Sequence, residues 1–315
     1  MCVRRLLLSV LLFSLLLTVA SCESATPSPS PVPYFLSTGT VYASESPTLR
    51  VRIESILLSG SEGFLTTVWM EDPGRQILKA SSPFHESLAT AQELAAKVSE
   101  AAVIINGSGY VSPIYPEIPD NYPGKSPDYY YTPLGSVTVT QGEVLRCLRH
   151  VPYYGLTLQQ DGLHLHVGDD PEEVTALGPA QTWSFYEGCP MIDHGEIILN
   201  YDWTFARRKA TRTILSLLPD GSYQILTCPH ITVVEAAEFL KEHFAPVWSY
   251  DLDGGPSSAL FCREDDGPKL LFGAGQPIVD VMAFTELTDD LVYQGPGIQT
   301  EEMWDLDMQS DAEDE

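Results

Sequence analysis

Residues 251–258, Asp-Leu-Asp-Gly-Gly-Pro-Ser-Ser, bring together side chains and glycines that could do chemistry. Asp251 and Asp253 are two positions apart at the end of an apolar run, so we expect them on one face of a strand. Carboxylates act as acids, bases or nucleophiles at sugars, while glycine amides and serine hydroxyls can hold an anion. A structural turn is one alternative. A calcium loop is another, although the Glu expected at its closing position is missing.

Two other short segments have the composition of ligand-contacting loops. Residues 104–110 run from two isoleucines into Asn-Gly-Ser-Gly, where the glycines allow close approach of a ligand to the backbone. Arg212 stands between two threonines at the start of a β-branched run, and its guanidinium fork matches a phosphate or a carboxylate. Taken alone, the first segment is better explained by a plain turn and the second by a surface arginine.

The sequence gives little support for a metal site or a cofactor, and we expect neither. His164 and His166 would share a strand face, but only His194 is available as a loose third ligand. The four cysteines of the domain contain no CxxC pair, which argues against structural zinc. They leave open one or two disulfides, or buried free thiols, at Cys147, Cys189, Cys228 and Cys262.

Hydrophobic periodicity predicts an α+β fold, rich in strands in mixed sheets with a few packed helices. The alternation at residues 49–53 is typical of a half-buried strand. Two apolar stripes predict helices over residues 88–98 and 232–244, the second opened by a Thr232–Glu235 capping box. Further strands are predicted at residues 65–70, 137–139, 163–167, 213–217, 223–226 and 278–284.

The N-terminus has the pattern of an export signal. Two arginines precede an uncharged run over residues 6–20, which is shorter than the ~20 apolar residues that span a membrane. Val19-Ala20-Ser21-Cys22 resembles the bacterial lipobox. We therefore expect a signal peptide at residues 1–21 and a lipid on Cys22 that anchors the chain to the extracytoplasmic face of the cell membrane. Ordinary secretion is the alternative.

Composition divides the rest of the chain into three parts. Residues 22–34 are a linker rich in Ser and Pro, and residues 35–290 form one domain without a repeat. Residues 291–315 form an acidic tail that is expected to be disordered, with eight acids and no base between positions 301 and 315.

The charge of the chain excludes some partners. Removal of residues 1–21 takes away two Arg and no acid, which changes the formal charge from −26 to −28. Such a chain is repelled by nucleic acid and by anionic lipid headgroups, so we expect no nucleic-acid partner and a membrane contact that depends on the lipid alone.

Taken in order, these segments resemble the phosphodiester glycosidase family, whose members include the uncovering enzyme that removes N-acetylglucosamine from a phosphodiester. The family's Ile-Asn-Gly-Gly-Phe-Phe is similar to residues 105–110, and its Pro-Arg-Thr-Ala-Ile-Gly to residues 211–215. Its Asn-Leu-Asp-Gly-Gly-Gly-Ser-Ser is similar to residues 251–258. The similarity covers roughly residues 45–285. The chain departs from the pattern at Ser108, Gly109 and Pro256, which changes the shape expected for the pocket floor.

The resemblance implies a single phosphodiester-glycosidase-like domain that acts on an envelope or exopolysaccharide glycan. It implies that Arg212 grips the phosphate and that Asp253 serves as acid–base or nucleophile at the anomeric carbon. Asp251 or Glu196 would supply a second carboxylate, and the Tyr- and Pro-rich residues 115–131 a sugar platform or a rigid loop. The substrate-binding residues implied are Asn106, Gly107, Thr213, Gly254, Gly255, Ser257 and Ser258. The alternative is a lipoprotein of the same fold that binds a glycan without cleaving it.

Overall fold

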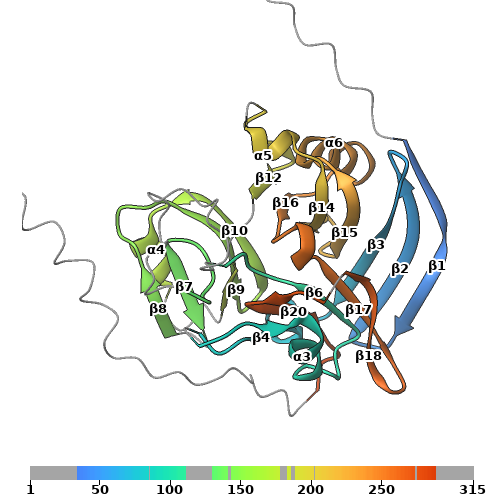
Figure 1. Ribbon diagram of the computed structural model, residues 1–315, viewed down its shortest axis with the longest axis horizontal. Coiled ribbons are helices and arrows are strands. Elements are labelled where there is room, and N and C mark those ends of the chain that lie inside the picture. Colours follow the sequence, from blue (N-terminus) through green and yellow to red (C-terminus); the bar gives the residue numbers. More distant parts are fainter. Residues whose placement is uncertain are drawn as a thin grey trace, which may run out of the picture. The chain divides into compact units, whose positions relative to one another are not determined.

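The computed structural model describes residues 34–84, 86–110, 130–140, 143–177, 183–185, 189–201, 203–273 and 275–288. The described residues form an α+β fold dominated by antiparallel sheets (Figure 1). The sequence prediction of the fold class is therefore confirmed. The predicted export signal, linker and acidic tail lie outside the described residues, apart from Tyr34. No described helix is long and apolar enough to cross a membrane.

The largest sheet has eight strands in the order β1-β2-β3-β15-β14-β16-β12-β13. Its first three strands form a meander in which alternate residues of β2 are buried and exposed, because only one face of this part packs on the core. The bounds are β1 Phe35–Glu45, β2 Leu49–Leu58, β3 Ser61–Met70, β12 Cys189–Asp193, β13 Glu196–Ile197, β14 Ala210–Leu217, β15 Tyr223–Ile231 and β16 Trp248–Asp251.

Two five-stranded sheets and one strand pair complete the described β structure. One sheet has the order β10-β9-β11-β7-β8, with bounds β7 Val137–Thr140, β8 Glu143–Cys147, β9 Tyr153–Gln159, β10 Gly162–Asp169 and β11 Trp183–Phe185. The other has the order β18-β17-β6-β20-β4, with bounds β4 Ile77–Ser81, β6 Val103–Asn106, β17 Ala259–Glu264, β18 Gly267–Gly273 and β20 Asp280–Phe284. The pair consists of β5 Ala89–Thr90 and β19 Pro277–Ile278.

The described helices are short, and α6 is the longest of them. It spans Val233–Phe244 and covers the eight-stranded sheet with a buried face that includes Val233, Phe239 and Leu240. The predicted capping box forms, because the Thr232 hydroxyl accepts from the Glu235 amide at 3.0 Å and the Glu235 carboxylate accepts from the Thr232 amide at 2.9 Å. The other helices are α2 Pro73–Gln76, α3 Ala91–Ala96, α4 Pro171–Ala176, α5 Thr204–Arg207 and the 3₁₀ turn η3 Gly255–Ser257.

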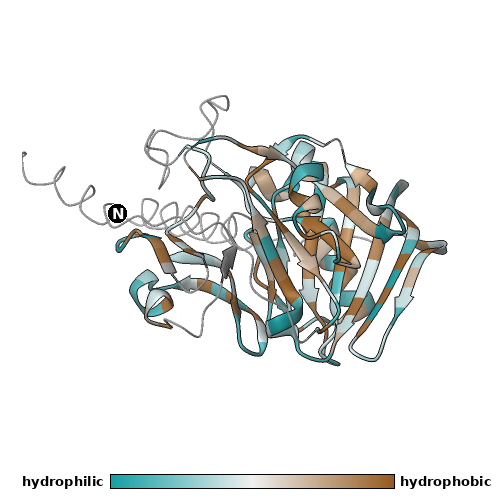
Figure 2. Cartoon of the chain, turned by 90° about the horizontal axis from the view of Figure 1, so that it is seen from below, coloured by the Kyte–Doolittle hydropathy of each residue, from teal (hydrophilic) through white to brown (hydrophobic). Residues whose placement is uncertain are grey.

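The main core lies between the eight-stranded sheet and the two five-stranded sheets. It joins residues as far apart in the sequence as Ile53, Leu156, Tyr250 and Met282. A second core lies on the opposite face of the eight-stranded sheet, under α6. Apolar and polar colours alternate along the strands of this sheet in Figure 2, as expected for strands with differing faces.

Two predicted elements differ from the structure in their limits. The helix expected over residues 88–98 begins only at Ala91, because Thr90 and Glu93 form an unpredicted capping box. The strand expected over residues 278–284 is divided at Val279, and each half pairs with a different partner. The other predicted strands are confirmed.

Candidate functional site

Asn106 connects the three segments that the sequence singled out. It ends β6, and its Nδ2 donates to the Asp253 carbonyl at 2.6 Å. Its Oδ1 accepts from the Thr213 hydroxyl and from the Ala259 amide, each at 2.9 Å. The Asp253 amide in turn donates to the Gly107 carbonyl at 3.1 Å. Because Asn106 is only 1% exposed, these bonds position the backbone of the site, and Asn106 does not itself face a ligand.

The two glycines after Asp253 are required for different reasons. A Cβ on Gly254 would lie 2.8 Å from the Thr211 carbonyl oxygen, so the turn can pack this closely against β14 only without a side chain. Gly255 has φ +61°, which favours glycine, and has open space around its Cα. Thr211 lies where the register between β14 and β15 shifts, an irregularity of the kind that re-aims neighbouring side chains.

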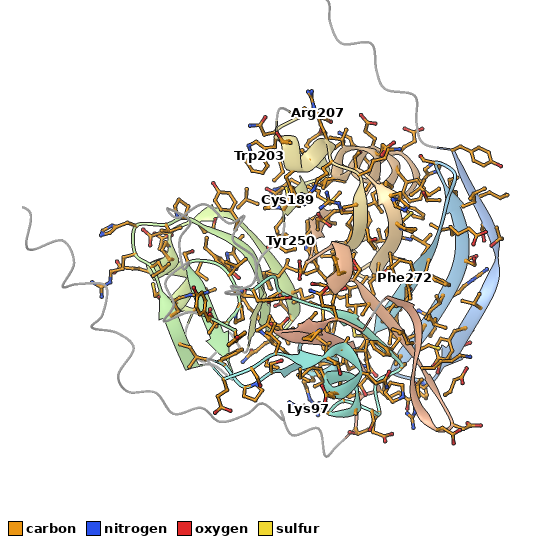
Figure 3. The ribbon with its side chains drawn as sticks, in the orientation of Figure 1. Lys97, Cys189, Trp203, Arg207, Tyr250 and Phe272 are labelled. Atoms are coloured by element: carbon orange, nitrogen blue, oxygen red, sulfur yellow. The ribbon has the colours of Figure 1, made fainter. Side chains whose placement is uncertain are left out.

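Arg212 lies directly beside this turn. A Cβ on Gly254 would be 3.8 Å from Arg212 Cδ and 3.9 Å from Nη1. Nη1 donates to Asp251 Oδ2 at 3.0 Å, in an ion pair whose side chains are 2% and 0% exposed. Nη2 donates to the carbonyls of Phe205 and Arg208, and the guanidinium lies 4.4 Å over the Phe205 ring. The helix α5, marked by the labels Trp203 and Arg207 in Figure 3, thus closes over Arg212.

This environment differs from the open guanidinium fork that the sequence suggested. Two of the three nitrogens of the Arg212 guanidinium are bound to protein atoms, and Nε is buried without a hydrogen-bond partner among the described residues. In this conformation Arg212 supports the Gly254 turn and the Asp251 carboxylate. It does not present donors to solvent.

Asp251 and Asp253 have opposite environments. Asp251 is fully buried, and burial raises its pKa to about 7 although the Arg212 charge and hydrogen bond act to lower it. Asp253 is partly exposed, and its Oδ1 accepts from the Gly254 amide at 2.9 Å. Asp253 is therefore the carboxylate of this segment that a ligand can reach.

The remaining predicted site residues are mostly buried. Thr213, Ser257 and Ser258 are 0%, 6% and 1% exposed, and the Ser258 hydroxyl is buried with no hydrogen-bond partner in the part of the chain that the structure describes. Glu196 pairs with Lys241 and begins β13, where it aligns with Asp193 of β12. Asp193 in turn aligns with Trp248 at the start of β16. Since Asp251 ends that strand, Glu196 is at the opposite end from the site and does not complete a carboxylate pair there.

A buried ionic cluster beside Asn106 was not predicted. Asp280 accepts from Lys79 Nζ at 2.9 Å, from the Ser108 amide at 2.6 Å and from the Ser108 hydroxyl at 2.8 Å. Lys79 and Asp280 are both fully buried. The cluster holds the loop after β6, and it gives Ser108, a departure from the family pattern, a structural role. The available signal was the presence of a charged residue within each of two apolar runs, residues 77–81 and 278–284.

The other chemical candidates of the sequence have ordinary partners. His164 Nε2 lies 2.6 Å from Asp161 Oδ1, and His166 Nδ1 lies 2.7 Å from Asp169 Oδ2. No group of three His, Cys, Asp or Glu in the described residues is arranged to hold a metal. The four described cysteines are free thiols, and burial raises the pKa of Cys189, next to Asp251, to about 12. Of the Tyr-rich segment only Tyr130 and Tyr131 are described; residues 115–129 lie outside the described part.

Comparisons with known proteins place the fold. No protein-family model and no curated protein sequence matches the chain. Among solved structures, the chain is similar to the catalytic domain of zebrafish N-acetylglucosamine-1-phosphodiester alpha-N-acetylglucosaminidase, auto-inhibited by its pro-peptide. The identity is 17%, the TM-score is 0.56, and the match covers 81% of this chain and 89% of that one.

A hypothetical protein from Synechocystis matches with 14% identity and a TM-score of 0.47, over 76% of this chain and 62% of that one. The zebrafish match, at low identity but over most of both chains, shows a distant relationship of fold. The described residues therefore have a fold similar to that of a phosphodiester glycosidase domain.

Proposed function

We propose that the protein is a cell-surface hydrolase that removes a sugar from a sugar-1-phosphodiester in an envelope or exopolysaccharide glycan. The observation that carries the proposal is the Asp253–Gly255 turn, where a partly exposed carboxylate lies on a backbone positioned by Asn106 and supported by Arg212. The distant similarity to a glycosidase domain supports the same class of reaction. Its cell-surface location rests on the export signal and the lipid expected at Cys22.

In this reaction Asp253 acts as base or nucleophile. Hydrolysis breaks the bond between C1 of the sugar and the phosphate oxygen, and the oxygen of water ends on C1. The departing phosphate is a stable anion, so protonation of the leaving group contributes little. The demanding part is delivery of an oxygen to C1, either by Asp253 itself or by a water that Asp253 deprotonates. Asp251 does not touch substrate, because it is fully buried against Arg212.

Arg212 acts in this scheme as a positioning residue. It fixes the turn through its contact with Gly254 and holds Asp251, and a direct contact with phosphate would require α5 to move away from it. Substrate oxygens then meet the backbone of Gly254 and Gly255, which are partly exposed beside Asp253.

A binding protein without activity is the second candidate. The observations that favour it are the closed environment of Arg212 and the positions of the two other candidate carboxylates. Asp251 is buried, and the exposed Glu196 lies at the opposite end of β16 from Asp253. Both functions use the same turn, so only turnover distinguishes them.

The test is an assay with a synthetic diester that joins C1 of N-acetylglucosamine to a simple alcohol through phosphate. Release of free sugar by the purified protein, and its loss in Asp253→Asn, is the expected result. Binding of the diester without release would establish the second candidate, and neither binding nor release would overturn both.

A further inference from the structure

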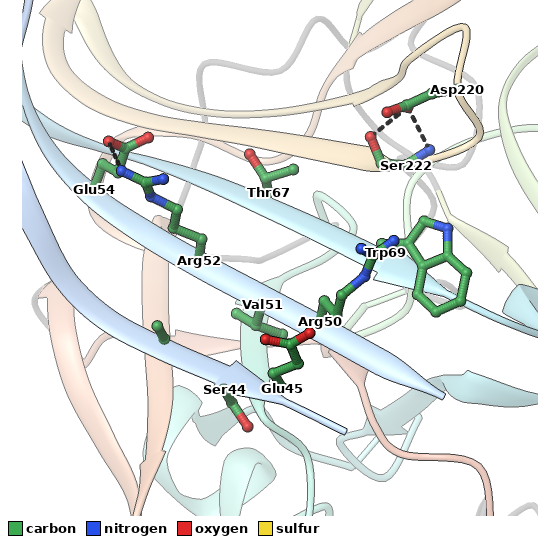
Figure 4. Close-up of a pocket in the computed structure, with 11 residues that line it drawn as sticks. Ser44, Glu45, Arg50, Val51, Arg52, Glu54, Thr67, Trp69, Asp220 and Ser222 are labelled. Carbon is green, nitrogen blue, oxygen red and sulfur yellow. Dashed lines mark hydrogen bonds and ion pairs between the residues drawn. The ribbon is translucent and has the colours of Figure 1, made fainter. Parts of the chain in front are cut away.

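A second concave site lies on the outer face of the eight-stranded sheet, far along the strands from Asp253. It is a pocket of about 600 Å³ whose floor is formed by β2 and β3 and whose walls come from β1 and the β14–β15 turn (Figure 4). Its lining includes the side chains of Arg50, Arg52, Glu54, Trp69 and Asp220. Along β14, Leu217 is already roughly 17 Å from Arg212, and the pocket lies farther on, beyond Leu217.

Arg50 and Trp69 form the centre of the pocket. They are direct cross-strand neighbours, and the Arg50 guanidinium lies 4.3 Å over the Trp69 ring. Stacking uses the flat face of a guanidinium and leaves its N–H donors free in the plane. Within the described residues, no hydrogen bond or ion pair uses the Arg50 guanidinium. The pocket thus offers guanidinium hydrogen-bond donors, fixed in position by the stacking, next to a half-exposed indole.

Acceptors surround these donors. Asp220 is held by the amide and hydroxyl of Ser222, at 3.0 Å and 2.6 Å, and these hydrogen bonds lower its pKa, with a further contribution from Arg50. Glu54 is bound to Arg52 at 3.0 Å, and Glu45 is exposed at the rim. The lining therefore has three carboxylates and two guanidinium groups, without an excess of positive charge for an anionic ligand.

We infer that the pocket around Arg50, Trp69 and Asp220 is a binding site for a neutral oligosaccharide chain. Sugar hydroxyls both donate and accept, which matches carboxylates and guanidinium donors placed side by side. The C–H face of a sugar packs on an indole, whose ring is apolar and rigid. A peptide strand is disfavoured because the floor consists of strands already paired on both sides, with no free backbone to pair with. An acidic polymer would meet a chain of formal charge −26.

The pocket shares no residue with the Asp253 turn, so binding there is independent of the proposed hydrolysis. The purified protein is titrated by calorimetry with three neutral probes, cellohexaose, maltohexaose and chitohexaose, and with one acidic probe, a polygalacturonate hexamer. We expect at least one neutral probe to bind. Trp69→Ala and Arg50→Met should each weaken that binding at least tenfold, because Met keeps the contact with Trp69 but has no donors.

Trp203→Ala is the matched control. Trp203 is also a partly exposed tryptophan, but it lies at the start of α5, on the side of Arg212. Its removal should leave the affinity unchanged. If Trp69→Ala does not fold, Arg50→Met, a change at an exposed side chain, decides the matter. The inference is overturned if none of the neutral probes binds, or if only the acidic probe binds. It is also overturned if binding is lost in Trp203→Ala but not in the pocket variants.

Discussion

Asp251 and Asp253 stand two residues apart, yet the first is sealed in an ion pair with Arg212 and the second reaches the surface of the site. The strand ends between them, and Leu252 donates its amide to the Thr213 carbonyl at 2.8 Å. The chain then turns at the two glycines, so the alternation that would place both carboxylates on one face is broken. One segment therefore supplies both the support and the reactive group of the candidate site.

Asp253→Asn should retain the fold and lose activity. The amide can still accept the Gly254 hydrogen bond, and the bond between the Asp253 carbonyl and Asn106 is unaffected. The amide side chain of the variant can neither attack carbon nor deprotonate water, so the rate of phosphodiester hydrolysis should fall by about 100-fold or more. The measurements are sugar release and the melting temperature. Asp265→Asn, on the exposed β17–β18 turn, is the control and should hydrolyse at the wild-type rate. Unfolding of Asp253→Asn would instead support a purely structural turn.

Gly254→Ala and Gly255→Ala should destabilise the protein through different causes. The first meets the Thr211 carbonyl at 2.8 Å and forces the turn away from β14, which we expect to cost about 1–3 kcal/mol and most of the activity. The second meets no atom of the described residues within 4 Å and has only the strain of φ +61°, about 1 kcal/mol. Chemical denaturation measures the stability of the two variants, and sugar release measures their activity. Equal losses of activity would show that packing of Gly254 against Thr211 is not what shapes the turn.

Asn106→Ala should destabilise the protein markedly. The substitution removes the partner of a part-buried carbonyl, a buried hydroxyl and a buried amide at once. Leaving such groups unsatisfied costs about 1–3 kcal/mol each, so we expect a loss of at least about 2 kcal/mol in the free energy of unfolding. The midpoint of urea denaturation tests this, with Gln160→Ala, on an exposed residue of the β9–β10 turn, as control. A midpoint equal to that of the control would contradict the connecting role of Asn106.

Asp251 should make the stability depend on pH. Its pKa in the folded protein is raised to about 7, above its ordinary value near 4, so the folded state holds the proton more tightly than the unfolded chain. Its contribution to stability is therefore complete below about pH 4 and is lost as the pH rises to about 7. Asp251→Asn does not titrate. We take the free energy of unfolding of the wild type minus that of the variant. This difference should be lower at pH 8 than at pH 5 by more than about 1 kcal/mol. A constant difference would show an ordinary carboxylate pKa.

Cys22→Ala should release the protein from the membrane. In bacterial cells the wild type should partition into detergent and carry acyl chains in its intact mass, whereas the variant should appear in the aqueous fraction or keep its signal. Cys2→Ala, which leaves the lipobox intact, is the matched control. Identical fractionation of all three proteins without acylation would favour ordinary secretion.

The fold class and several elements could be predicted because their signals are local. The alternation of residues 49–53 predicts β2, and Thr232 with Glu235 predicts the start of α6. The segments around Asn106, Arg212 and Asp253 stood out by composition. Their order along the chain, compared with the family motifs, suggested that they meet.

The contacts within the site could not be predicted, because they depend on distant pairings. Asp251 reaches Arg212 only because β16 pairs with β14 in a register that aligns Asp251 with Ile214. Phe205 and the α5 carbonyls then determine whether the guanidinium is open or closed. Asp280 likewise meets Lys79 and Ser108 because β20 lies between β4 and β6. None of these registers has a signature within a short window of sequence.

The first strand of the domain bears on self-association. β1 is the outer strand of the eight-stranded sheet, is mostly exposed, and is interrupted by two irregularities, between Ser37 and Gly39 and between Thr40 and Tyr42. An unpaired edge invites a strand from a second molecule, whereas bulges break the regular spacing of donors and acceptors that such a strand would need. The opposite edge, β13, has only two residues. Proteins crowded side by side on one surface would thus be kept from joining their sheets edge to edge.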